Sequence, residues 1–202
     1  TNVTDMSHMF YKCSKLLSLD VSNFNTEKVI TMGCMFAECK LLEQLDLTSF
    51  DTSIVVGIGS MFEDCVSLKK LDLSSFNTVS VGDMCNMFSG CNNLEQLDLS
   101  SFNTINVILM DNMFRECSKL KYLDLSSFNT RNVIYMICMF KGCTSLENIN
   151  LSSFDTAEVT TMDSMFKDCE SLAMLDLSNF RTERLEDMNE MFSGCSKLTV
   201  LN

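Results

Sequence analysis

Hydrophobic and polar residues follow two different rhythms along this chain, and the two rhythms alternate. In residues 120–125 the leucines are spaced to face one side while Asp124 faces the other, which predicts a short strand. The preceding stretch, residues 107–117, instead carries apolar residues at steps of three and four. Such steps predict a short helix or a chain of tight turns with one buried face, and Asn103 or Thr104 lies where a helix N-cap is expected.

This strand and return segment recur with a fixed period of 26 residues and without insertion or deletion. A Met-Phe dipeptide begins at Met9, Met35, Met61, Met87, Met113, Met139, Met165 and Met191. A cysteine follows four residues after each of these methionines, and a second column of Phe is followed two residues later by Thr. A period of 26 lies within the range of roughly 20 to 29 residues that is typical of leucine-rich repeats. The sequence therefore predicts an α/β solenoid, an array of about eight units with a parallel sheet on one face and short helices or turns on the other.

One unit alone buries too few apolar side chains to offset the entropy of ordering its backbone. Stacking supplies the missing contacts and places neighbouring units about 4.8 Å apart. We therefore expect residues 1–202 to form a single solenoid. Because neither end has a polar capping unit, we also expect it to be a fragment of a longer array.

The charge of the chain limits its possible partners. A formal net charge of -12 argues against nucleic acid and against anionic membrane surfaces, which both require clustered Lys and Arg. No run of 18 or more apolar residues is present, so we expect no membrane insertion by this segment.

The cysteine column does not predict a metal or redox centre. Neighbouring units would place these Cα atoms about 5 Å apart, within disulfide range, but side chains in such a column point in parallel. Buried free thiols are the favoured interpretation. His8 is the only imidazole and no C-x-x-C occurs, so no zinc site, no cofactor and no catalytic residue is predicted.

A column of acidic residues follows the predicted strands. It consists of Asp20, Asp46, Asp72, Asp98, Asp124 and Asp176, with Asn150 and Asn202 as interruptions. Like charges about 5 Å apart repel by roughly 1 to 3 kcal/mol per pair, so something must offset the repulsion. Hydrogen bonds to the turn backbone and Ser hydroxyls are one explanation. The other is an acidic strand face that holds weakly bound Ca²⁺ or meets a basic partner.

A second candidate surface is apolar. The positions after the recurring Val are polar in several units but hydrophobic in two neighbouring ones. The candidate partner-binding residues are Ile105, Ile108, Leu109, Ile134, Tyr135 and Ile137. They would form one convex patch of a few hundred Å², which favours a contact site for self-association or for a foreign protein. The alternative is that local twist turns some of them inward.

The template M-F-x-x-C-x-x-L-x-x-L-D-L-S-S-F-N-T-x-x-V-x-x-M resembles the repeat of BspA-type leucine-rich-repeat surface proteins, which are found in mycoplasmas, other bacteria and some protists. The chain departs from this template only at scattered positions, such as Ile58, Asn150 and Leu185. The resemblance covers the whole chain. It implies an extracellular, surface-exposed adhesion or host-interaction role and supplies no catalytic residue.

Two hypotheses of function follow. In the first, the chain is a non-enzymatic cell-surface module that binds a protein or glycan. In the second, the stacked repeats form a structural spacer or a self-assembling filament.

Overall fold

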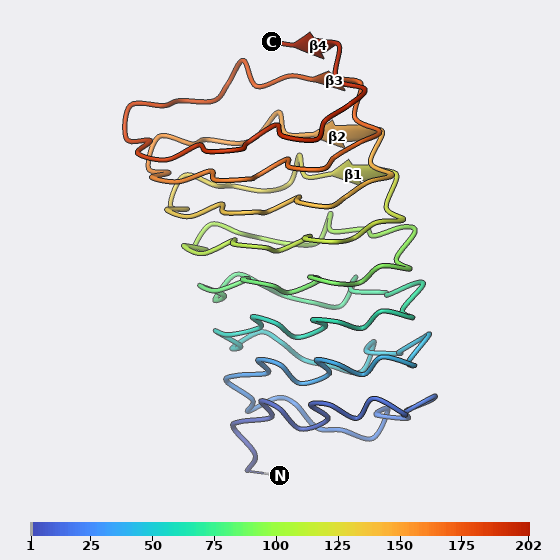
Figure 1. Cartoon of the computed structure of the whole chain (residues 1–202). Coiled ribbons are helices and arrows are strands. Elements are labelled where there is room, and N and C mark those ends of the chain that lie inside the picture. Colours follow the sequence, from blue (N-terminus) through green and yellow to red (C-terminus); the bar gives the residue numbers. More distant parts are fainter. Residues whose placement is uncertain (1) are drawn as a thin grey trace.

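The computed structural model describes residues 2–202, and it shows each 26-residue unit as one turn of a solenoid. The turns are stacked one above another, with the N-terminus and the C-terminus at opposite ends of the stack (Figure 1). We number the repeats so that each ends at its Thr. Repeats 2 to 7 are then residues 27–52, 53–78, 79–104, 105–130, 131–156 and 157–182, with repeat 1 (1–26) before them and the partial repeat 8 (183–202) after them.

The strand segments lie on one side of the stack. The four strands of the described residues are β1 (Tyr122–Asp124), β2 (Asn148–Asn150), β3 (Met174–Leu175) and β4 (Val200–Leu201). They pair in parallel, β1 with β2 and β3 with β4, in register with the repeat. The predicted strand position and direction are confirmed, but the expected continuous sheet is replaced here by two small sheets. β1 ends at a turn in which Asp124 Oδ1 accepts the Ser126 N–H at 3.0 Å and so bends the chain.

The return segments contain turns and no helix within residues 2–202, so the turn alternative is confirmed and the helix alternative is wrong. In repeat 5, alternate amides bond three residues back, as Cys117 N–H does to the Phe114 carbonyl. The amides between them bond to the next repeat, as Phe114 N–H does to the Met139 carbonyl at 2.9 Å. Left-handed residues at Asn112 (φ 56) and Glu116 (φ 60) make this alternation possible, because a right-handed helix would turn every amide inward.

A continuous parallel ladder runs through the first part of the return segments, with one bridge residue in each repeat. Its bridges join Asp5, Thr31, Gly57, Asp83, Leu109, Tyr135, Thr161 and Asp187 in turn. We call the surface over this ladder the ladder face. It consists of the bridge residues, the second position after each of them, the two positions before the preceding Val and the one position after that Val.

The interior is built from identical residues stacked on one another. Columns of Met, Phe, Cys and Leu are buried, and the Phe rings of neighbouring repeats stack, as Phe88 and Phe114 do with centroids 5.7 Å apart. A buried Thr column ties each repeat to the next. Thr104 Oγ1 accepts the Asn129 N–H at 2.7 Å and donates to the Asn129 carbonyl at 3.0 Å. Thr104 is therefore not an N-cap, and Asn103, whose Oδ1 accepts the Ile105 N–H, opens a turn rather than a helix.

Candidate binding faces

The acidic column lies exposed along the strand side, in the order expected from the sequence. Each Asp of the column accepts the N–H of the residue two positions later, at 2.9 to 3.0 Å. The backbone hydrogen bond from Ser126 is the main cause that holds the pKa of Asp124 below its ordinary value. The structure therefore contains the local hydrogen bonds that the first explanation requires. In each Asp these turn hydrogen bonds use one carboxylate oxygen, Oδ1.

Weak Ca²⁺ binding by this column stays a prediction. Among residues 2–202, no group of three or more His, Cys, Asp or Glu side chains is arranged to hold a metal ion. Beside the column, an ion pair joins neighbouring repeats, with Lys69 Nζ and Glu43 Oε2 2.6 Å apart.

Two exposed positions precede the second leucine of every strand segment, and they differ from repeat to repeat. They are Leu17-Ser18, Glu43-Gln44, Lys69-Lys70, Glu95-Gln96, Lys121-Tyr122, Glu147-Asn148, Ala173-Met174 and Thr199-Val200. The leucines around them are fixed and largely buried. We call the surface formed by these positions and the Asp column the strand face. On this face the exposed side chains vary from repeat to repeat over a frame of leucines that is nearly unchanged.

Shallow hollows lie on the strand face between neighbouring repeats. One of about 230 Å³ is lined by Asp98, Ser100, Tyr122 and Asp124, among others. A wider one of about 560 Å³ is lined by Gln44, Asp46, Lys70 and Asp72, among others. These hollows combine carboxylates and hydroxyls with an aromatic ring or an ammonium group.

The predicted apolar residues lie together on the ladder face. Leu109 and Tyr135 form one of its bridges, and the Ile134 N–H donates to the Ile108 carbonyl at 3.0 Å. Ile108 and Tyr135 are 45% and 41% exposed, and Ile105, Leu109, Ile134 and Ile137 are half-buried. None of the six is turned fully into the core. Their role as a partner site stays a prediction.

The apolar surface is longer than the sequence analysis proposed. Ile30, Ile54, Val56 and Val79 are also exposed on the ladder face, in repeats 2 to 4. Ile30 and Val56 occupy the same template position as Ile108 and Ile134, so comparing that column across all repeats would have found them.

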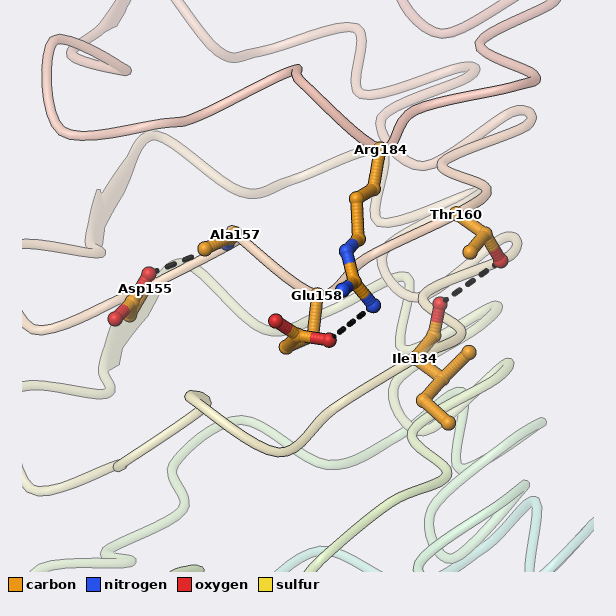
Figure 2. Close-up of polar contacts among 6 residues, drawn as sticks. All are labelled: Ile134, Asp155, Ala157, Glu158, Thr160 and Arg184. Atoms are coloured by element: carbon orange, nitrogen blue, oxygen red, sulfur yellow. Dashed lines mark hydrogen bonds and ion pairs between the residues drawn. The ribbon is translucent and has the colours of Figure 1, made fainter.

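The apolar row ends at repeat 7. Figure 2 shows this end, where Thr160 takes the template position of Ile134 and donates its hydroxyl to the Ile134 carbonyl at 3.4 Å. Beside it, Arg184 and Glu158 form an ion pair at 2.5 Å.

The cysteines of the Met-Phe-x-x-Cys column are free thiols, mostly buried, as predicted. From the second repeat on, each thiol donates to the Phe carbonyl 29 residues earlier, as Cys117 does to Phe88 at 3.2 Å. Burial raises the pKa of Cys65 to about 12 and that of Cys117 well above its ordinary value. These thiols serve as small packed side chains with one hydrogen bond each.

Among the described residues, no helix is long and apolar enough to cross a membrane.

The fold is similar to solved leucine-rich-repeat structures. A leucine-rich-repeat protein of T. pallidum is 22% identical, with a TM-score of 0.55 over 84% of this chain and 72% of that one. A leucine-rich-repeat protein from Eubacterium ventriosum is 19% identical, with a TM-score of 0.48 over 85% of this chain and 42% of that one. A leucine-rich cell surface protein from Faecalibacterium prausnitzii is 17% identical, with a TM-score of 0.36 over 97% of this chain and 75% of that one. The first of these supports the leucine-rich-repeat fold.

No curated protein sequence matches the chain. A family model does, in three overlapping stretches, residues 1–97, 60–173 and 115–200. Together with the leucine-rich-repeat fold, this match confirms the predicted resemblance to BspA-type repeats. The chain belongs to the family described as "Mycoplasma protein of unknown function, DUF285".

Proposed function

We propose that the chain is a non-enzymatic binding module of a cell surface, and that its strand face recognises a protein or glycan. One observation carries the proposal. The frame of the strand segment is the same in every repeat, whereas the two exposed positions within it change. A solenoid turns such variation into an extended surface of side chains about 4.8 Å apart, which is how repeat proteins present recognition sites.

The chemistry of the strand face changes along the stack. Repeats 2 to 4 present Glu43, Lys69, Lys70 and Glu95. Later repeats present exposed apolar groups, with Tyr122 55% and Met174 64% exposed. Tyr122 beside the carboxylates of the hollow in repeats 4 and 5 offers a flat ring together with hydrogen-bond acceptors. That combination suits the hydroxyls and apolar face of a sugar, or the basic side chains of a peptide.

The test is binding of the purified chain to an array of purified glycans and cell-surface proteins. A variant with Tyr122→Ser and Met174→Ser is expected to lose at least about tenfold in affinity for any specific ligand found. Leu41→Ser is the matched control, because Leu41 is 45% exposed but lies outside the strand face. Equal loss in the control, or ligands retained by the double variant, would contradict the strand face as the site.

The alternative function is a structural spacer or filament. It is supported by the unbroken ladder of bridges from Asp5 to Asp187, which makes the described stack a continuous rod. A spacer has no ligand of its own. If this function is correct, no ligand on the array will bind the wild type more tightly than the Tyr122→Ser and Met174→Ser variant.

A further inference from the structure

One of three glycines on the ladder face, Gly82, is not explained by the fold of a single chain. A Cβ on Gly57 or Gly59 would lie 3.2 Å from Thr31 Oγ1 or Asp83 Oδ2 of a neighbouring repeat, so packing within the chain already favours glycine at those two positions. Gly57, Gly59 and Gly82 have none of the left-handed backbone angles that favour glycine. A Cβ on Gly82 would lie 3.8 Å from its nearest neighbour, the Asn106 carbonyl oxygen, which is an ordinary contact. The same template position carries Ile30, and also Val56, Ile108 and Ile134, so the ladder accepts a large side chain there.

The three glycines and the large residues that share their template positions in repeats 5 and 6 lie in opposite halves of the ladder face. Gly57 and Gly59 of repeat 3 occupy the template positions of Tyr135 and Ile137 of repeat 6. Gly82 of repeat 4 occupies that of Ile108 of repeat 5. Each glycine therefore has a large residue at the matching position when the two halves are mirrored about the boundary between repeats 4 and 5.

We propose that the ladder face binds a second copy of this chain, packed antiparallel about a two-fold axis between repeats 4 and 5. Repeat 3 of one copy then faces repeat 6 of the other, and repeat 4 faces repeat 5. Ile108 fits over Gly82, and Tyr135 and Ile137 fit over Gly57 and Gly59. A two-fold axis that crosses the stack keeps each template column opposite itself, so the size match holds in both halves of the interface.

The spacing of the ladder favours this partner. Rows of side chains about 4.8 Å apart interdigitate along their length only with rows of the same spacing, which a second copy supplies. Val56 and Ile134 meet across the axis in this arrangement, and so do Val79 and Ile105. All four side chains are exposed or half-buried in the single chain.

Charge selects one register among the neighbouring ones. Moving the partner by one repeat in one direction places Asp83 opposite the Asp83 of the other copy. Moving it by one repeat in the other direction places Asp111 opposite Asp111. In the proposed register no like charges face each other on the ladder face of repeats 2 to 7, and Lys28 of repeat 2 faces Glu158 of repeat 7.

The dimer is expected to be weak. An exposed apolar row of this kind offers a few hundred Å². A standard stable interface buries about 800 Å² on each partner. The net charge of -12 also opposes association at low salt. Sedimentation equilibrium of the purified chain from about 1 µM to about 1 mM, at physiological salt, covers the range in which such a dimer would form.

The variant Gly82→Ile distinguishes the proposed dimer from non-specific hydrophobic association. Adding an isoleucine to an apolar surface strengthens non-specific association, but in the proposed dimer it places a second large side chain opposite Ile108, where glycine leaves room. We expect the dissociation constant of the dimer to rise at least about tenfold. Met174→Ser on the strand face is the control, and it is expected to change the dissociation constant of the dimer by no more than about twofold. Circular dichroism checks that each variant keeps the wild-type melting curve.

A charge exchange tests the register. Lys28→Glu and Glu158→Lys are each expected to weaken the dimer about threefold or more, and the double variant is expected to restore it. Within one chain these changes remove only exposed contacts, from Lys28 to Asn2 and from Glu158 to Arg184. The proposal is overturned if the wild type stays monomeric throughout, if Gly82→Ile tightens association, or if the double variant fails to restore it. These measurements of dimer formation use no strand-face ligand. Their outcome is therefore independent of whether the proposed function of the strand face is correct.

Discussion

In repeat 5 the return segment, residues 107–117, bonds to the next repeat through alternate amides along its length. The strand segment of the same repeat, residues 120–125, pairs with the next repeat through β1 and through the flanking Lys121 carbonyl and Leu125 N–H, and then bends at the turn held by Asp124. The return side also carries the ladder and the buried Cys and Thr columns, whereas the strand side carries the exposed Asp column. The comparison teaches that the repeat is fixed in register mainly from the return side. The strand side is thereby free to vary its exposed residues.

Alkaline pH is expected to produce the largest effect, because it acts on several buried thiols at once. Burial raises the pKa of Cys39 to about 11 and those of Cys65 and Cys143 to about 12. The unfolded chain releases these protons near pH 9, so above that pH the folded state binds more protons than the unfolded one, and stability falls as pH rises. Each such thiol contributes a loss of about 1.4 kcal/mol per pH unit between the two pKa values.

Thermal melts between pH 8 and pH 10.5 measure this loss. Cys117→Ala is expected to make the decline shallower, whereas Cys13→Ala, at an exposed site, leaves it unchanged. A melting temperature that stays constant to pH 10.5 would show that the thiols are not buried as described.

Thr104→Val is expected to have the next largest effect. The substitution keeps the shape of the side chain but leaves the N–H and the carbonyl of Asn129 without the buried hydroxyl that serves both. We expect a loss of about 2 kcal/mol in the free energy of unfolding. Ser126→Ala on the exposed strand side is the control, with a change of about 0.5 kcal/mol or less. Urea denaturation compares the two, and similar losses would remove the difference between the sides.

The strict period made much of the fold predictable. Met113, Phe114, Cys117 and Leu120 recur at 26-residue steps, so their burial and the stacking of repeats follow from the pattern alone. The choice between helix and turns did not follow, because both bury residues at steps of three and four. The turns form through hydrogen bonds to another repeat, and a pattern within one segment does not reveal such distant partners.

The Thr column was misassigned for the same reason. Thr104 was placed as a local N-cap, whereas its hydroxyl acts across repeats. The candidate site was predicted in part. Ile108 and Tyr135 were found because two large hydrophobic residues stood where polar ones were expected. Ile30 and Val56 were missed because each stands beside Thr or Gly and so looked less unusual.

Gly90→Ala is expected to cost about 1 to 2 kcal/mol. Gly90 has φ 74, and a Cβ there would lie 2.1 Å from Asp64 Oδ1 in the preceding repeat. Gly82→Ala is the matched control within the same repeat. Its backbone angle is ordinary and its Cβ is accommodated, so it is expected to leave stability unchanged or to raise it by about 0.5 kcal/mol. Chemical denaturation of both variants at low protein concentration measures the contrast, and equal effects would argue against the left-handed turn at Gly90.

The smallest effect is expected on the strand side, from Asp124→Asn. Asn150 already occupies this template position in the next repeat and accepts the Ser152 N–H at 3.1 Å, so an amide preserves the turn. The hydrogen bond from Ser126 lowers the pKa of Asp124, so the folded chain favours the carboxylate, and the amide, a weaker acceptor, is expected to cause only a small loss of stability. Because each Asp has one oxygen engaged in its turn, we expect Ca²⁺ to bind weakly and to raise the melting temperature of the wild type by at most about 2 °C over chelator. Asp124→Asn should reduce that shift, with Ser126→Ala as the control that keeps the charge. A calcium shift well above this size would mean that the column holds the ion as a true site, and the strand side would then contribute to stability as the return side does.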